Sequence, residues 1–324
     1  MSSNPTILIV APEPRAEPLE PLWRCLEALP ARIIAAPPGA DAPDEAPSAV
    51  VVACDPEAPV PEGLEAVQPA LAALGARGWG AKATLISPYR RGGGALLEAL
   101  EAAEVAHLIS WHDAGLWRQV ALGVRRRLAT GDARWGVAPW LEGAEVERRE
   151  VTSSRQRDPL LDELGDFAAA RGVNSRVATL AQSVADEFII NAVYNAPVDE
   201  AGAFRYARRS RTEGVELPQE DAATFCFASD GERLAVSIHD RFGSLTPETV
   251  RRYLLRGLRK GDDQIEHKDG GAGLGLYTVL EATTRFIVRI APGAGTEMIG
   301  IFEGPGSYRR CLGRPKSLQL ITET

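Results

Sequence analysis

The sequence predicts a protein in two parts, an N-terminal doubly wound parallel α/β sheet and a C-terminal α+β sandwich. The 324 residues exceed the length at which one hydrophobic core usually stops growing, about 250–300 residues. Before residue 128, short apolar runs alternate with helical patterns, which is typical of βαβ units. After residue 155, helical patterns come first and antiparallel strand signals follow. That order predicts helices on one face of a mixed or antiparallel sheet.

The N-terminal half contains apolar runs that predict buried strands at 6–10, 49–54, 83–87 and 106–111. Apolar residues at helical spacing predict helices at 17–29, 64–74, 94–103 and 115–128. The stretch 131–149 is rich in Gly, Trp and charged residues and indicates a connector. We therefore expect a first domain at 5–127, a connector at 128–154, a second domain at 155–304 and a C-terminal tail at 305–324.

The C-terminal half opens with helical patterns at 158–170 and 176–195. Strand patterns follow at 223–228 and 233–239, joined by Asp230-Gly231, which is a good hairpin signal. The remaining pattern predicts helices at 247–258 and 273–283, a polar loop at 259–271, and strands at 285–290 and 296–302 around a Gly-rich turn.

Composition narrows the classes of function. The net charge of −8 provides no positive field for phosphates, which argues against nucleic acid as a main partner. The four cysteines are far apart and form no C-x-x-C pair, so we expect reduced thiols rather than disulfides or zinc. The N-terminus lacks a basic region before its short apolar run, and no stretch reaches eighteen apolar residues. We expect a cytoplasmic protein that does not span a membrane.

Three segments of the C-terminal half carry candidate chemistry, and the first is the helix at 176–195. Glu187, Asn191 and Asn195 recur every four residues, which places them along one stripe. An amide oxygen is a hard ligand suited to Mg²⁺, and a carboxylate can deprotonate a nucleophile. A solvated polar face is the alternative interpretation.

The second segment is LAVSIHDRFGSL, in which Asp240 ends a strand pattern and Gly243 supplies a turn. A carboxylate at a strand end can accept a hydrogen bond from the amino group of adenine, whereas it repels the carbonyl oxygen of guanine. An Asp-initiated turn, common after any strand, is the alternative.

The third segment is KDGGAGLGLY at 268–277, in which four glycines lead into a helical pattern. Backbone N–H groups of a Gly-rich segment at a helix N-terminus can bind a phosphate. The segment lacks the G-K-[S/T] of a Walker motif, and no strand precedes it as in a dinucleotide-binding fingerprint. Chain flexibility alone is the other interpretation.

The order E-x-x-x-N, D-x-x-G, polar loop and G-x-G-L-G over 155–304 resembles the GHKL superfamily of Bergerat-fold ATPases. That group includes gyrase, MutL, histidine kinases and anti-sigma-factor serine kinases. The resemblance implies that Glu187 is a general base and that Asn191 binds Mg²⁺. The residues that it implies for ATP binding are Asn191, Asn195, Asp240, Gly243, Lys268, Gly271, Gly273, Leu274, Gly275 and Thr296.

Two further features follow from the same resemblance. The family's D-x-G-x-G carries Phe242 and Ser244 here in place of its glycines, and the bulk of Phe242 is expected to narrow or reshape the adenine pocket. Residues 259–269 match the lid over ATP. Basic residues of the lid region are candidates for phosphate contact or for a solvated face, namely Arg256, Arg259, Lys260 and Lys268.

Residues 5–127 resemble a response-regulator receiver. Asp55 then falls where the phosphoacceptor belongs, and Ser87 where the switch hydroxyl belongs. The acidic pair that holds Mg²⁺ is replaced by Ala11-Pro12, with only Glu13 nearby, and Trp111-His112 occupy the place of the lysine. Because phosphorylation needs Mg²⁺, we expect a degenerate receiver that binds a partner protein, with Asp55 as a turn residue. A doubly wound domain with an unrelated ligand is the alternative.

Two functions remain open at this point. None of the four histidines lies on a dimerising helical hairpin, which disfavours an autophosphorylating histidine kinase. The first function is a kinase of the anti-sigma type, which uses ATP and Mg²⁺ to phosphorylate Ser or Thr of a partner signalling protein. The second is a non-catalytic adaptor in which bound ATP sets the conformation of the lid. The resemblance also suggests a homodimer.

Overall fold

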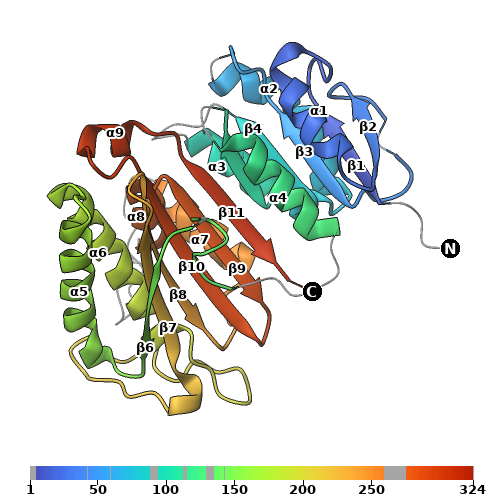
Figure 1. Cartoon of the computed structure of the whole chain (residues 1–324). Coiled ribbons are helices and arrows are strands. Elements are labelled where there is room, and N and C mark those ends of the chain that lie inside the picture. The colour runs from blue at the N-terminus through green and yellow to red at the C-terminus, as the bar shows by residue number, and fades with distance from the viewer. Residues whose placement is uncertain are drawn as a thin grey trace. The chain divides into compact units, whose positions relative to one another are not determined.

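The computed structural model describes residues 5–323, except 42, 59, 88–93, 112–114, 129–134, 142 and 259–274 (Figure 1). The described chain has mixed α/β content with both parallel and antiparallel strand pairs. It divides into two compact units. Unit 1 is Met1–Ala133 with Pro315–Gln319, and unit 2 is Arg134–Arg314 with Leu320–Thr324.

Unit 1 contains a parallel sheet in the order β2-β1-β3-β4-β5, which is one of the common doubly wound orders. Its strands are β1 (Thr6–Val10), β2 (Arg32–Ala36), β3 (Ala49–Ala53), β4 (Ala83–Ser87) and β5 (His107–Ser110). Every residue of β3, β4 and β5 is buried, as expected of strands covered on both faces. The first residues of β11 (Ser317–Thr322) add an antiparallel strand, with Leu318 opposite Leu108.

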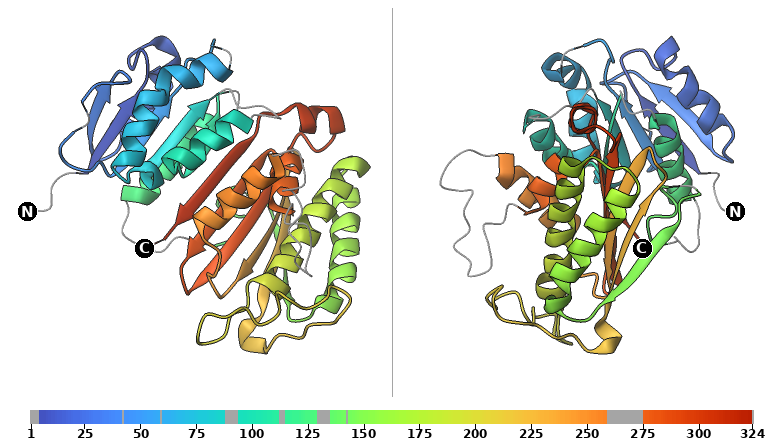
Figure 2. Two further views of the ribbon diagram at one scale, coloured as in Figure 1. Left: turned by 180° about the vertical axis from the view of Figure 1, so that it is seen from behind. Right: turned by 60° about the vertical axis from the view of Figure 1, so that its left-hand side comes forward.

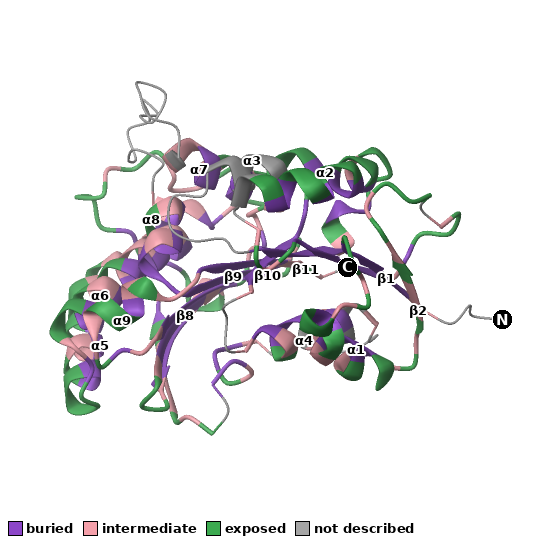
Figure 3. Cartoon of the chain, turned by 90° about the horizontal axis from the view of Figure 1, so that it is seen from above, coloured by how far each residue is buried: buried purple, intermediate pink, exposed green. Residues whose placement is uncertain are grey.

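The helices of unit 1 cover both faces of this sheet. They are α1 (Glu20–Glu27), α2 (Val60–Ala76), α3 (Gly94–Ala103) and α4 (Leu116–Leu128), with short 3₁₀ turns at Glu17–Leu19 and Gly80–Lys82. Figure 3 shows α1 and α4 on one face, with α2 and α3 on the other. Leu22 and Leu26 of α1 and Val120 of α4 pack in one core with Ile7 and Ile9 of β1. The predicted helices are confirmed in type and place, while β2 was missed because it is a short, half-exposed edge strand.

Unit 2 contains a sheet in the order β9-β10-β8-β7-β6, with every neighbouring pair antiparallel. Its strands are β6 (Val146–Val151), β7 (Ala223–Ser229), β8 (Arg233–Asp240), β9 (Arg285–Ala291) and β10 (Gly295–Glu303). The assignment of 131–149 to a connector missed β6, because four of its six residues are charged. Near the C-terminus, Glu323 N–H donates to the carbonyl of Ile290 on β9 at 2.8 Å.

The helices of unit 2 are α5 (Arg157–Ala170), α6 (Ser175–Ile190), α7 (Pro247–Leu258), α8 (Gly275–Ala282) and α9 (Tyr308–Gly313), with 3₁₀ turns at Ser154–Gln156 and Gln219–Asp221. Helices α5 and α6 run side by side (Figure 2), and α6 packs on β8, β10 and α8. Gly300 of β10 permits this packing, since a Cβ there would lie 2.9 Å from Thr283 Cγ2 and 3.1 Å from Val184 Cγ1. In the core between α6 and the sheet, the buried ring of Phe188 on α6 stacks on that of Phe286 on β9, with ring centroids 6.3 Å apart.

Residues 135–141 cover the opposite face of this sheet. Gly136 N–H donates to Glu297 Oε1 at 2.6 Å, and Trp135 lies against His239, with ring centroids 4.5 Å apart. His239 and Glu297 are paired in register and point away from the helices. Among the described residues, no helix is both long and apolar enough to cross a membrane.

Candidate functional site

The end of α6 carries a hydrogen-bonded row of three polar side chains. Asn191 Nδ2 donates to Glu187 Oε1 at 2.8 Å, and Asn195 Nδ2 donates to Asn191 Oδ1 at 2.7 Å. The turn Asn191–Asn195 is π-helical, a form that often occurs at functional sites. The residues predicted to share one stripe are therefore in contact.

Burial controls the charge of Glu187. The loss of water around its carboxylate raises its pKa, while the hydrogen bond from Asn191 and the positive charge of Arg211 oppose that rise. A half-buried carboxyl group with a raised pKa holds a proton more readily near neutral pH than an exposed one. Glu187 is thus suited to accept a proton.

Gly275, the first residue of α8, lies directly against this row. A Cβ at Gly275 would be 1.9 Å from Glu187 Oε1 and 2.0 Å from Glu187 Cδ, so only glycine permits this approach without a shift. The contact brings the last glycine of the predicted phosphate segment to the Glu187 carboxylate. Other predicted residues of that segment and its lid lie outside the described residues: Arg259, Lys260, Lys268, Gly271, Gly273 and Leu274.

Asp240 ends β8 as a buried carboxylate. Its Oδ1 accepts the backbone N–H groups of Phe242 at 2.9 Å and Gly243 at 3.3 Å. Burial raises the pKa of Asp240 to about 6, although these hydrogen bonds favour the charged form. Thr296 is its register partner on β10, and the buried Thr296 hydroxyl lies close enough to the Asp240 carboxylate to favour its charged form and lower its pKa. Asp240 therefore shapes a turn and also lies beside the buried hydroxyl of Thr296.

Gly243 turns the chain after Asp240 in the left-handed region, at φ +59°. A Cβ at this position would lie 2.1 Å from the carbonyl oxygen of Ala291 and 2.8 Å from the N of Gly293. The turn after β8 is thus packed against the turn between β9 and β10, and it requires glycine.

Phe242 and Ser244, which stand where the resemblance predicts glycines, contact the segment 196–222. The Arg205 guanidinium lies 5.3 Å from the Phe242 ring centroid and forms an ion pair with Asp221. Ser244 Oγ donates to the carbonyl of Ala196 at 2.9 Å. Phe242 and Ser244 therefore contact a segment whose role the sequence did not reveal, although its four arginines at 205–211 were a visible signal.

The candidate phosphoacceptor region of unit 1 has a different character. Asp55 is exposed, and its Oδ1 accepts the N–H of Glu57 at 2.9 Å, as in an Asx turn. Trp111 Nε1 donates to the carbonyl of Cys54 at 2.9 Å, and burial raises the pKa of the Cys54 thiol to about 12. Within the described ranges no group of three His, Cys, Asp or Glu side chains is placed to hold a metal ion. The hydrogen bond from the N–H of Glu57 to Asp55 Oδ1 agrees with a turn role for Asp55.

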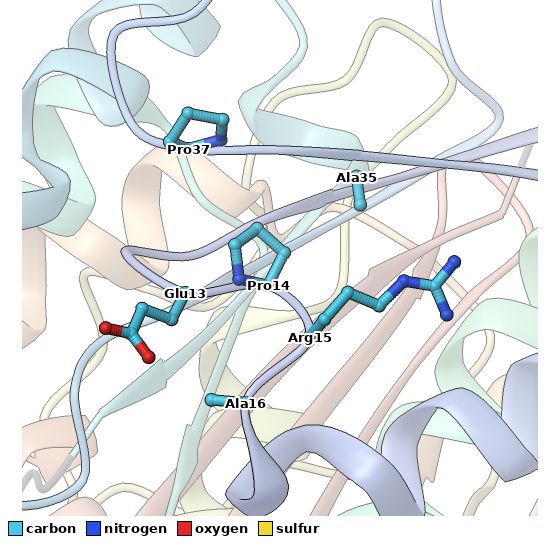
Figure 4. A pocket seen from close by; sticks show the side chains of 6 residues that line it. All are labelled: Glu13, Pro14, Arg15, Ala16, Ala35 and Pro37. Carbon is cyan, nitrogen blue, oxygen red and sulfur yellow. The ribbon is translucent and has the colours of Figure 1, made fainter.

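Unit 1 also has an open depression of about 720 Å³ beside Glu13 (Figure 4). Its lining residues are Glu13, Pro14, Arg15, Ala16, Ala35 and Pro37. Figure 4 shows the charged ends of Glu13 and Arg15 pointing to opposite sides. The Arg15 guanidinium lies 3.5 Å from the centroid of a Trp23 ring. The depression therefore lacks the convergent polar groups of a small-molecule site.

No family model matches the chain, and no curated protein matches it either.

Proposed function

We propose that unit 2 is a Bergerat-type ATP-binding domain that transfers the γ-phosphoryl group of ATP to a serine or threonine of a partner signalling protein. The observation that carries this proposal is the contact between the Glu187–Asn191 pair and Gly275. This contact places Glu187, the candidate base, and Asn191, the candidate cation ligand, at the start of α8. We expect the start of α8 to face the phosphates of ATP. Asp240, buried at the end of β8, supports an adenine site in the same unit.

The residues around Asp240 fit an adenine ring. The Asp240 carboxylate can accept a hydrogen bond from the amino group, and the buried Thr296 hydroxyl beside it can turn to donate its one hydrogen to a ring nitrogen. A guanine presents a carbonyl oxygen in place of the amino group, which the carboxylate repels. This pair therefore favours ATP over GTP.

The row on α6 fits a magnesium ion held jointly with phosphates. Asn191 Oδ1 accepts one hydrogen bond from Asn195, so its second lone pair can face a hard cation. When bound, Mg²⁺ neutralises negative charge on the phosphates. During transfer, the hydroxyl oxygen of the partner bonds to the γ-phosphorus, the bond to the β–γ bridging oxygen breaks, and Glu187 takes the hydroxyl proton.

For unit 1 we propose a degenerate receiver that binds a partner protein without being phosphorylated. The strand order and the places of Asp55 after β3 and Ser87 in β4 support the receiver likeness. The exposed turn at Asp55 and the Trp111 side chain over Cys54 support the loss of phosphorylation.

A second function, the non-catalytic adaptor, is favoured by one observation. The half-buried Phe242 follows Asp240 where the family has glycine, and its ring lies near the Arg205 guanidinium. Such bulk at the adenine site is compatible with a nucleotide that is held rather than turned over.

Calorimetry of the full chain with ATP and GTP, each with Mg²⁺, tests the proposal. We expect ATP to bind at least about tenfold more tightly than GTP, a difference of about 1.4 kcal/mol. Labelled ATP with cell extract then tests transfer. ATP binding with neither transfer nor hydrolysis favours the adaptor, and absence of binding at millimolar nucleotide refutes both functions.

Replacing Gly275 tests the contact that carries the proposal. In Gly275→Ala, the new methyl group displaces the Glu187 carboxylate, and misplacing a catalytic group by about 1 Å can cost about 100-fold in rate. We expect phosphoryl transfer or hydrolysis to fall by that factor, with a small change in melting temperature because the displaced group ends a flexible side chain. Gly306→Ala is the matched control, since a Cβ there meets no atom within 4 Å. An unchanged rate in Gly275→Ala refutes the assigned contact.

A further inference from the structure

The segment 196–222 between α6 and β7 has a defined structure. Its start is closed by a bridge between Val198 and Phe204, and its middle is held by the Arg205–Asp221 ion pair. Its later part is fixed to the residues before α5, because Val215 N–H donates to Ser154 Oγ at 2.9 Å. The arginines that it carries are Arg205, Arg208, Arg209 and Arg211.

This segment is attached to the π turn of the candidate site through Tyr194. Tyr194 is buried, and its Oη donates to the carbonyl of Glu213 at 2.8 Å. The Arg211 guanidinium lies 5.4 Å from the Tyr194 ring centroid, within range of a cation–π contact. Arg211 thereby lies against a side chain of the same turn that contains Asn191 and Asn195.

Two other arginines of the run, Arg205 and Arg209, have different surroundings. Arg205 pairs with Asp221 and lies near Phe242, at the Asp240 end of the site. Arg209 is exposed and lies 5.1 Å from the Tyr206 ring centroid. Arg211 alone of these three acts electrostatically on Glu187, where its charge favours the carboxylate form and opposes the burial that raises the pKa. Arg211, which is exposed, therefore acts on the Glu187 end of the row.

We propose that Arg211 binds the terminal phosphate of ATP, so that the segment 196–222 supplies a phosphate-binding residue to the site. This inference rests on the proposed ATP site. A guanidinium presents a planar fork of N–H donors that matches phosphate oxygens. A cation there also offsets the repulsion between the Glu187 carboxylate and the phosphate, and it stabilises charge that develops during transfer.

Calorimetry of the full chain with ATP, ADP and adenosine, in the presence of Mg²⁺, tests this assignment. A hydrogen-bonded contact to a charged group is worth about 1.5–3 kcal/mol, which corresponds to about 10–100-fold in affinity. We expect Arg211→Ala to weaken ATP binding by this factor, to weaken ADP binding by less than about threefold, and to leave adenosine binding unchanged. Arg211→Lys should recover part of the ATP affinity, because it restores the charge without the fork.

Arg209→Ala, in the same segment, is the control and should leave all three affinities unchanged. The inference is overturned if Arg211→Ala binds ATP as the unaltered protein does. A parallel loss for ATP, ADP and adenosine also overturns it, because that pattern indicates a role in folding of the segment. If the unaltered protein binds none of the three, the proposed function fails and this inference falls with it.

Discussion

Glu187→Gln is expected to lower the rate of γ-phosphoryl transfer by about 10²–10⁴-fold, the usual contribution of a positioned general base. Glutamine keeps the shape of the side chain, and its Oε1 can still accept the hydrogen bond that Asn191 Nδ2 donates to Glu187. The substitution therefore removes the proton acceptor without removing the row on α6. We expect ATP affinity to change by less than about threefold. Release of labelled phosphate to protein and to water measures the rate, and calorimetry measures the affinity.

Glu163→Gln provides the matched control. Glu163 lies on α5, and its carboxylate accepts hydrogen bonds from Arg149 on β6, one of them at 2.9 Å. The same chemical change there removes an ion pair without touching the α6 row. An unchanged transfer rate in Glu187→Gln, with the control also unchanged, means that another group accepts the proton or that the reaction needs no base.

Local periodicity predicted the row on α6 because helical geometry fixes which residues share a stripe. The spacing of Glu187, Asn191 and Asn195 placed them on one stripe, and their side chains are hydrogen-bonded in that order. The turn glycine Gly243 was predictable for a similar reason. Gly243 has a positive φ, a backbone conformation that residues other than glycine rarely adopt.

Contacts between distant segments could not be predicted from spacing. The match of Phe242 with Arg205 and of Ser244 with Ala196 depends on how the irregular segment 196–222 folds back, and no periodic pattern encodes that path. Strands β2 and β6 were missed for a different reason. One is half-exposed and the other is rich in charge, so neither shows the apolar run of a central strand.

Asp240→Asn is expected to stabilise the fold and to weaken adenine binding at the same time. The folded-state pKa of Asp240 is about 6, whereas an unfolded Asp titrates near about 3.9. The folded protein therefore binds more protons between these values, and the stability of the unaltered protein falls as pH rises from about 4 through about 6. Asparagine carries no charge to desolvate, and its Oδ1 can still accept the N–H groups of Phe242 and Gly243.

The expected gain in unfolding free energy is about 2–3 kcal/mol at about pH 8. This gain is absent below about pH 4, where Asp240 is protonated in both the folded and the unfolded protein. Urea denaturation at several pH values measures it. Asp199→Asn is the control, because Asp199 Oδ1 also accepts two backbone N–H groups, at 2.8 and 3.0 Å, but on an exposed residue. We expect its effect to stay within about 0.5 kcal/mol.

The binding side of this prediction is measured with adenosine, which has no phosphate to titrate. In the unaltered protein, adenosine affinity should fall as pH drops through about 6, because protonation of Asp240 removes the charged acceptor for the adenine amino group. In Asp240→Asn the affinity should be about 10–100-fold lower and independent of pH over this range. Carboxyl groups with a pKa strongly shifted by burial are concentrated at functional sites, where a ligand can use the charge. If the Asp240→Asn variant is more stable and binds adenosine with unchanged affinity, Asp240 is not part of the nucleotide site.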